Sequence, residues 1–193
     1  MTASPSAGTT GLLDSGRTRL RRRLGTWSTL FCLVGAGVVI GTSPASAATL
    51  VTCTGTQNIS YSPGLTLAPR TVTITGTNNL GPCVAPNTSI TSGTIEFSAT
   101  ASSSCLDLLD SGSAVNVVKW SDGSTSTLQV TRTVSQVAGQ QVDAFTGSVA
   151  SGTFQGATVT WTITNVSLDL LDCATPAGLT SQVGLDVFTL ASV

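Results

Sequence analysis

The sequence contains no histidine, and this absence excludes several kinds of active site. The Ser-His-Asp and Cys-His arrangements of hydrolases need an imidazole as general base, and most zinc and copper sites use imidazole ligands. No serine lies in a G-x-S-x-G or S-x-x-K motif, and no G-x-x-x-x-G-K phosphate loop is present. We therefore expect a protein that is not an enzyme and that needs no cofactor.

Most of the few basic residues lie near the amino terminus, in an expected secretory signal peptide. Residues 17–23 hold five arginines and precede an apolar run over residues 30–40, which is too short to span a bilayer as a helix. Ala45-Ser46-Ala47 has the small-x-small pattern of a cleavage site. We expect residues 1–47 to be the signal peptide and residues 48–193 to form one secreted domain. We favour the general export route over the twin-arginine route, because Gly25-Thr26 follows the arginines where an apolar pair would be expected.

Without this leader the chain has little positive charge. It keeps three basic and eight acidic side chains, a net charge of −5. Such a surface cannot form the basic stripe that binds nucleic acid or an anionic membrane. We expect no nucleic-acid partner and no membrane association after signal cleavage, which leaves a cell-surface or a small-molecule ligand.

Four cysteines follow the leader, and an even number in an exported chain indicates disulfides. Three pairings can be drawn. We favour Cys53–Cys83, which flanks one hairpin-like unit, and Cys105–Cys173, which lies in a mirrored motif. A zinc site is not expected, because no C-x-x-C spacing is present.

Sustained helical periodicity is missing, whereas the alternation typical of half-buried strands recurs. Residues 158–164 place Val159, Trp161 and Ile163 on one face and threonines on the other. About nine or ten short strands follow from this pattern and from turn residues, with turns or breaks expected at 62–64, 78–82 and 121–123. We predict an all-β domain, an antiparallel two-sheet sandwich of immunoglobulin-like or jelly-roll-like type. A small closed barrel is the alternative.

A mirrored motif surrounds the second cysteine pair. Residues 105–110 read Cys-Leu-Asp-Leu-Leu-Asp, and residues 168–173 read Leu-Asp-Leu-Leu-Asp-Cys. We predict that these two segments, the clasp, pair as antiparallel strands with Cys105 opposite Cys173 and Leu108 opposite Leu170. The doubled leucine breaks strict alternation, so a single helical turn is the alternative for residues 105–110.

The clasp would gather four carboxylates. We favour solvated acids beside a disulfide, with no metal bound. Calcium binding through carboxylate oxygens is the first alternative, and an acid–base pair of glycosidase type is the second. The residues concerned are Asp107, Asp110, Asp169 and Asp172.

Aromatic residues are also few, so a stacking surface for a sugar or another ligand would be small. Trp161 lies on the apolar face of its strand and is expected in the core. Trp120 lies beside a turn, and with Tyr61 it is the candidate ligand-binding surface.

Four segments carry a resemblance: CTG at 53–55, YSPGLT at 61–66, WSDGSTST at 120–127 and GSVASGTFQG at 147–156. They are similar to segments of small exported actinobacterial proteins of unassigned function. A more distant likeness is to the apoproteins of neocarzinostatin-type chromoproteins, although the cysteine spacing differs. The resemblance implies a secreted two-disulfide β domain and, from the second family, a small-molecule ligand; it carries over no site residue.

Together these observations predict a secreted, extracellular, non-enzymatic binding or structural module of unknown ligand. A carboxylate-dependent hydrolase of glycosidase type is one alternative, and it would need two acids facing each other across an open cleft. A small-molecule carrier is another, and it would need an apolar groove.

Overall fold

The computed structural model describes residues 47–137, 140–165 and 171–193. The expected signal peptide lies outside these ranges except for its last residue, and Asp169 and Leu170 also lie outside them. No helix within the described ranges is long and apolar enough to cross a membrane.

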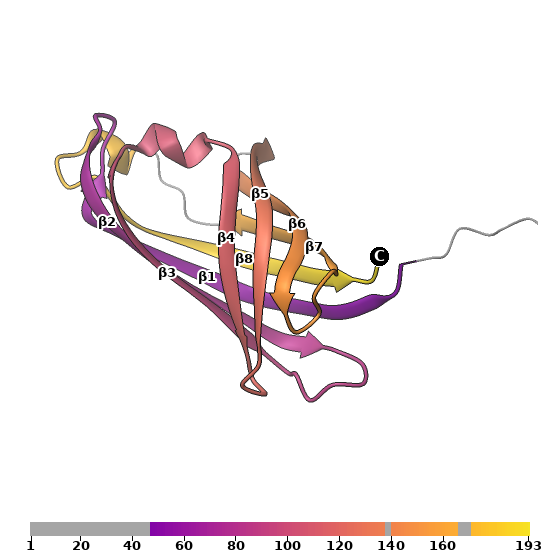
Figure 1. Cartoon of the computed structure of the whole chain (residues 1–193). Coiled ribbons are helices and arrows are strands. Elements are labelled where there is room, and N and C mark those ends of the chain that lie inside the picture. The colour runs from indigo at the N-terminus through magenta and orange to yellow at the C-terminus, as the bar shows by residue number, and fades with distance from the viewer. Residues whose placement is uncertain (1–46, 138–139, 166–170) are drawn as a thin grey trace, which may run out of the picture. The chain divides into compact units, whose positions relative to one another are not determined.

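The described residues form a closed antiparallel barrel in which each strand pairs with the next and β8 pairs with β1 (Figure 1). The expected two-sheet sandwich is therefore wrong, and the alternative of a small barrel is correct. The strands are β1 (Thr49–Leu65), β2 (Arg70–Val84), β3 (Gly93–Ser103), β4 (Gly112–Trp120), β5 (Thr125–Val137), β6 (Gln140–Gly152), β7 (Thr158–Asn165) and β8 (Leu179–Ala191). Two short 3₁₀ helices complete the described elements, η1 (Cys105–Leu109) and η2 (Asp172–Ala174).

The barrel arises because two predicted breaks lie inside long strands. β1 continues through residues 62–64, and β2 continues through residues 78–82. The register between these strands shifts between Cys53↔Cys83 and Gly55↔Leu80, so Gly81 and Pro82 occupy a bulge. Proline is tolerated in a sheet at such a bulge. Long, strongly twisted strands can curl until the first meets the last, which short strands in two layers do not do.

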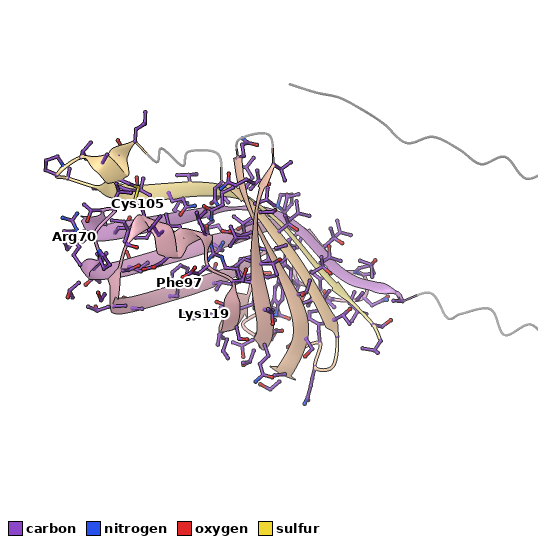
Figure 2. All side chains as sticks on the ribbon, turned by 90° about the horizontal axis from the view of Figure 1, so that it is seen from above. Arg70, Phe97, Cys105 and Lys119 are labelled. Carbon is purple, nitrogen blue, oxygen red and sulfur yellow. A yellow bond between two sulfur atoms is a disulfide. The ribbon has the colours of Figure 1, made fainter. Side chains whose placement is uncertain are left out.

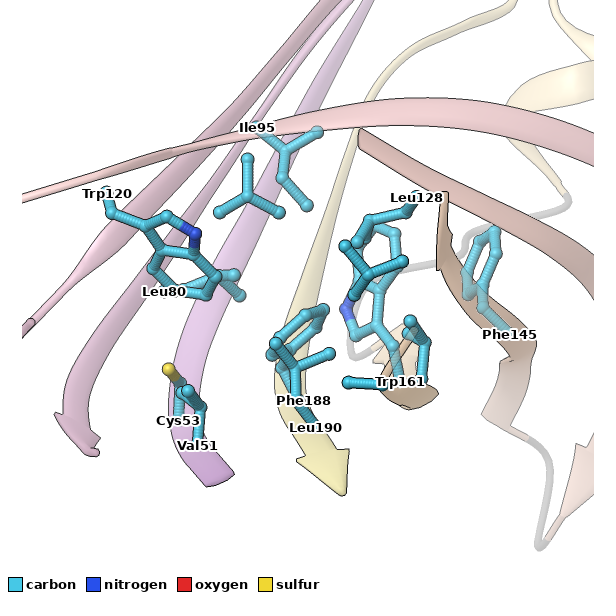
Figure 3. Close-up of a cluster of buried hydrophobic side chains, with 14 of the residues drawn as sticks. Val51, Cys53, Leu80, Ile95, Trp120, Leu128, Phe145, Trp161, Phe188 and Leu190 are labelled. Atoms are coloured by element: carbon cyan, nitrogen blue, oxygen red, sulfur yellow. The ribbon is translucent and has the colours of Figure 1, made fainter. Parts of the chain in front are cut away.

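One end of the barrel is filled by a hydrophobic core (Figure 3). Trp120 is only 3% exposed in this core, so its expected position at the surface is wrong. Its ring contacts Phe188 edge-on, with 6.1 Å between the ring centroids, and Phe188 contacts Trp161 in the same way at 6.3 Å. Trp161 stacks on Phe145 with a centroid distance of 4.4 Å. Each such pair adds about 0.5–1.5 kcal/mol beyond its buried area. The aromatic rings thus run from the core toward the opposite end of the barrel.

Two disulfides join the pairs that the sequence favours. Cys53 and Cys83 are register partners on β1 and β2, with a Cα–Cα distance of 4.0 Å. Cys105 and Cys173 are 6.2 Å apart between Cα atoms and link η1 to η2. The first disulfide therefore lies within the sheet, whereas the second joins segments outside it.

The clasp does not form paired strands. Cys105 and Cys173 lie in the 3₁₀ helices η1 and η2, so the helical-turn alternative is correct for the first segment. The Asp107 carboxylate accepts a hydrogen bond of 2.8 Å from the Ser104 amide, which favours a helical turn over an extended chain. A side chain that binds the backbone three residues earlier competes with strand pairing.

These helices and the β1–β2 turn, residues 66–69, cover the other end of the barrel; we call them the cap. The Cys105 amide donates to the Thr66 carbonyl at 2.9 Å, and the Leu67 amide donates to the Cys173 carbonyl at 3.2 Å. Arg70, which lies at the same end as Cys105 (Figure 2), donates through Nη2 to the Ala177 carbonyl at 2.9 Å. Backbone bonds and a disulfide thus hold the cap in place.

The barrel predicts unequal effects of the same substitution at two adjacent positions of β4. Val118 is fully buried and packs in the core, whereas Val117 is 43% exposed on the outer face. We expect Val118→Ala to lower the free energy of unfolding by about 2 kcal/mol, through lost burial and a residual cavity. Val117→Ala should change it by less than about 0.5 kcal/mol. Urea denaturation measures both, and equal losses would contradict the assigned faces of β4.

Candidate functional site

A cavity of about 370 Å³ lies between the core and the cap. Side chains from all eight strands and from η1 line it. The alternation of each strand turns every second side chain inward, so each strand contributes side chains to the wall. The wall is mainly apolar and includes Ile59, Ile74, Phe97, Leu108, Phe145 and Trp161.

The cavity opens sideways between β3 and β4. These strands pair only at Gly93↔Trp120, Thr94↔Lys119 and Ile95↔Val118, and they then run apart toward η1 (Figure 1). Phe97 has the inward parity of Ile95 and lines the cavity, yet it is 36% exposed. Asn116 lines the cavity from the β4 side. We call the unpaired stretch, residues 96–103 of β3 and 112–117 of β4, the seam.

The ring of Phe97 at the seam lies directly against Gly76 of β2 (Figure 2 labels Phe97). The two residues are register partners, and a Cβ atom on Gly76 would lie 2.1 Å from the ring. Only glycine leaves room for the ring at this place. The position of Phe97 therefore depends on the missing side chain of its neighbour.

An ion pair occupies the polar part of the wall. Arg132 Nη2 lies 3.0 Å from Asp143 Oδ1. Arg132 also donates to the backbone carbonyls of Leu108, at 2.8 Å, and Asp110, at 3.0 Å. The same arginine thus neutralises a buried carboxylate and fixes η1 over the cavity.

Four amide side chains occupy one continuous layer inside the barrel, which we call the amide layer. Register pairs link Gln141 to Asn165, Asn165 to Gly184, Gly184 to Gln57, and Gln57 to Asn78. All four amide side chains are at least nine-tenths buried. In each, the carbonyl oxygen has no hydrogen-bond partner among the described residues.

Carboxylates fix the orientation of three of these amides. Asn165 Nδ2 and Gln141 Nε2 donate to Asp143 at 3.1 and 2.9 Å, and Asn78 Nδ2 donates to Asp186 at 3.0 Å. An ionised carboxylate only accepts, so each amide must turn its nitrogen toward it and its oxygen away. Gly184 leaves space within the layer, since a Cβ atom there would lie 3.0 Å from Asn165 Oδ1.

Asp186 is buried next to this layer, between Asn78 and Trp161. Burial raises the pKa of Asp186 to about 6, although hydrogen bonds from Asn78 and from Trp161 Nε1 oppose the shift. The carboxyl group does not belong to the cavity wall. It is therefore a buried acid that no ion pair within the described residues compensates.

The expected ligand surface of Tyr61 and Trp120 does not form. Trp120 donates through Nε1 to Ser126 inside the core, at 2.8 Å. Tyr61 is 5% exposed and lines the cavity, where its hydroxyl donates to Gln182 Oε1 at 2.9 Å. Burial raises the pKa of the Tyr61 phenol well above its usual range. Tyr61 thus faces an internal site instead of the solvent.

The three described carboxylates of the clasp do not gather at one site. Asp107 lines the cavity and accepts hydrogen bonds from the Ser103 hydroxyl and the Ser104 amide, and these lower its pKa. Asp110 and Asp172 are exposed at the ends of η1 and η2, and Asp169 lies outside the described residues. Within the described ranges no three histidine, cysteine or acidic side chains gather as metal ligands would.

The comparisons with known proteins add no relative. No family model matches the chain, and neither a curated protein nor a solved structure is similar enough to count as a match. The site is therefore described from its own residues.

Arg132, Asp143 and Gln57 also line the cavity, and none of them was predicted as a site residue from the sequence. A signal for Arg132 was present, because it shares the strand parity of Leu128 and Val130, two apolar residues that are buried on β5. A polar residue at an inward position of an alternating strand indicates an internal polar site.

Asp186 predicts an unusual dependence of stability on pH. Its pKa is about 6 in the folded chain and near 3.8 when exposed, so the folded state binds the proton more tightly. Its contribution to stability is complete below about pH 4 and is lost as the pH rises through about 6. We expect Asp186→Asn to be more stable than the wild type by about 2–3 kcal/mol above neutral pH, with no difference near pH 4.

Urea denaturation at several pH values measures this difference. Asp122→Asn is the control, because hydrogen bonds from Ser124 lower the pKa of Asp122 and its contribution must therefore fall as the pH is lowered. A pH-independent difference between wild type and Asp186→Asn would show that the buried carboxyl does not titrate as described.

Proposed function

We propose that this chain is an exported, non-enzymatic binding protein that holds one small, mainly apolar molecule inside its barrel. The observation that carries the proposal is the cavity beneath the cap, about 370 Å³ in volume and lined mostly by apolar side chains. Ligand pockets commonly have volumes of roughly 300–1,000 Å³ and combine apolar walls with a few placed polar groups. Eight-stranded barrels are just wide enough to be filled by side chains or to hold one small ligand.

The seam supports this proposal, because an internal site needs a path from the solvent. Phe97 and Asn116 lie on opposite sides of the seam, and both also line the cavity. A small molecule can reach the cavity there without breaking a strand pair. The cap, in contrast, is held by the Cys105–Cys173 disulfide and by Arg132.

The two disulfides support export, because such bonds persist mainly in oxidising compartments. They agree with the signal peptide expected from residues 1–47. We propose that the mature protein acts outside the cell, where an internal site can carry or sequester its ligand.

A carboxylate-dependent hydrolase has less support. Asp107 and Asp143 both line the cavity, but a glycosidase needs one carboxyl that is protonated at neutral pH. Hydrogen bonds lower the pKa of Asp107, and Asp143 is held in an ion pair with Arg132. Asp186, whose pKa is raised, does not line the cavity.

Binding can be tested with N-phenylnaphthylamine, a neutral dye that fluoresces in apolar surroundings. We expect the mature protein to bind it, with energy transfer from Trp161, which lies in the cavity wall. Ile74→Trp places an indole into the cavity and should weaken binding at least tenfold, since Ile74 lines the site. Fluorescence titration measures the affinity.

Thr73→Trp is the matched control, because Thr73 is exposed on the outer face of β2 next to Ile74. It should leave the affinity unchanged. Failure of the wild-type protein to bind the dye, or equal losses in both variants, would contradict an internal site.

A further inference from the structure

The seam leaves backbone hydrogen-bonding groups of β3 unpaired. The Ser121 amide donates to the Ser92 carbonyl at 3.0 Å, in the same register as the pairs of β3 with β4. In an antiparallel strand, the N–H and C=O of one residue point to the same edge, and successive residues alternate. Every second residue after Ser92 therefore turns its backbone groups toward β4. Beyond the last pair these groups have no partner among the described residues at Ser98, Thr100 and Ser102.

The free edge of β3 lacks the features that usually prevent such an edge from pairing with another chain. Proline, lysine, inward-pointing charges and bulges serve this purpose in natural sheets. Residues 97–103 contain no proline and no charged side chain, and β3 pairs with β2 without a register shift. Unprotected strand edges of this kind can bind extended peptides as an added strand.

The inner face of the seam can also receive side chains from an added strand. Ala99 and Ala101 follow Phe97 at inward positions of β3, and both are exposed. The Phe97 ring lies against Gly76 of β2, on the side away from the seam. A strand beside β3 would therefore bury apolar side chains against these residues and the cavity wall.

Two exposed acids lie at the wide end of the seam. Asp107 of η1 accepts a hydrogen bond from Ser103, the last residue of β3, and Asp110 ends η1 shortly before β4. Hydrogen bonds lower the pKa of Asp107, so it is ionised at neutral pH. Arg132, which binds η1, is already paired with Asp143. A basic group at this end is therefore attracted, with the modest strength expected between exposed charges.

We propose that the seam binds an extended peptide of a partner protein, which pairs antiparallel with β3 as an added strand. All described strand pairs are antiparallel, so this direction continues the sheet. The peptide bonds to the backbone of Ser98, Thr100 and Ser102, and its inward side chains are apolar. Its amino-terminal end lies beside η1, where a basic residue meets Asp107. This inference goes beyond the proposed function, because the peptide is recognised by a strand edge.

A single peptide strand fits this edge better than a second copy of the chain does. The free edge of β3 faces β4 of the same barrel, and η1 joins the two strands across the wide end (Figure 1). A second copy could offer only its own β3 edge, which is enclosed in the same way.

The test uses the octapeptide KTVTVTVT with both ends blocked, and isothermal titration calorimetry with the mature, disulfide-bonded protein. We expect one peptide to bind per chain. In the proposed register the lysine lies opposite Ser103 and near Asp107, and the valines lie opposite Ala101, Ala99 and Phe97.

Two methylated forms of the peptide show how it pairs. Opposite residues of an antiparallel pair exchange hydrogen bonds, so the threonine N–H groups point to β3 and the valine N–H groups point away. N-methylation of the threonines should weaken binding by about tenfold or more, because these donors are lost. N-methylation of the valines keeps every side chain and should leave the affinity unchanged.

Thr100→Pro tests the same edge from the side of the protein. The Thr100 N–H faces the seam, so proline removes no hydrogen bond of the strand ladder but blocks the edge. We expect it to weaken peptide binding by about tenfold or more. Thr100→Val is the matched control, because it loses the same hydroxyl contact with Thr73 but keeps the N–H. It should bind like the wild type.

The charge at the wide end is tested by replacing the lysine of the peptide with glutamate. The affinity should fall about fivefold in low salt, and the difference should shrink as salt is added. Equal affinities in low salt would contradict the placement of the amino-terminal end beside η1.

The other outcomes are equally decisive. If the peptide does not bind, or if the threonine-methylated form or folded Thr100→Pro binds as well as the unmodified pair, the added strand is wrong. If only valine methylation prevents binding, the strand is parallel and the stated direction is wrong. If the protein is a dimer that Thr100→Pro converts to a monomer in sedimentation, a second copy occupies the edge in place of a peptide. Loss of dye binding with peptide binding intact would contradict only the proposed function.

Discussion

The pairing of β1 with β8 is the constraint on which the rest of the structure depends. It runs from Thr49↔Ala191 to Leu65↔Leu179 and turns an open sheet into a closed ring. Closure removes the outer edges of the sheet, and it also limits the interior to the inward side chains of eight strands. At one end these are large and fill the space. At the other end the wall combines large apolar side chains with Gln57, Arg132 and Asp143, and a cavity remains beneath the cap.

The polar interior follows from the same limit. Asp143 and Asp186 are both buried, and amides and Arg132 surround them. Each amide that gives its nitrogen to a carboxylate turns its oxygen toward the interior. The unpaired amide oxygens of Asn78, Gln141 and Asn165 are thus a consequence of burying two acids.

Strands and disulfide pairs could be predicted from the sequence, whereas closure of the sheet into a barrel could not. Alternation around Val159, Trp161 and Ile163 correctly indicates strands, and the mirrored motif correctly indicates a Cys105–Cys173 pair. Turn chemistry at 62–64 and 78–82 is misleading, because a bulge absorbs Gly81 and Pro82 and the long strands that result can close. The site could be predicted only in part: Arg132 and Gln57 lie at inward positions, but their meeting in one cavity depends on which strand pairs with which.

The contact between Phe97 and Gly76 affects the width of the seam between β3 and β4. The ring rests on bare backbone, at a place where any side chain on residue 76 would occupy the same space. Phe97 is therefore held against β2 instead of projecting across the gap toward β4. The width of the opening between β3 and β4 therefore depends on residue 76 being glycine, which has a hydrogen atom where every other residue has a Cβ atom.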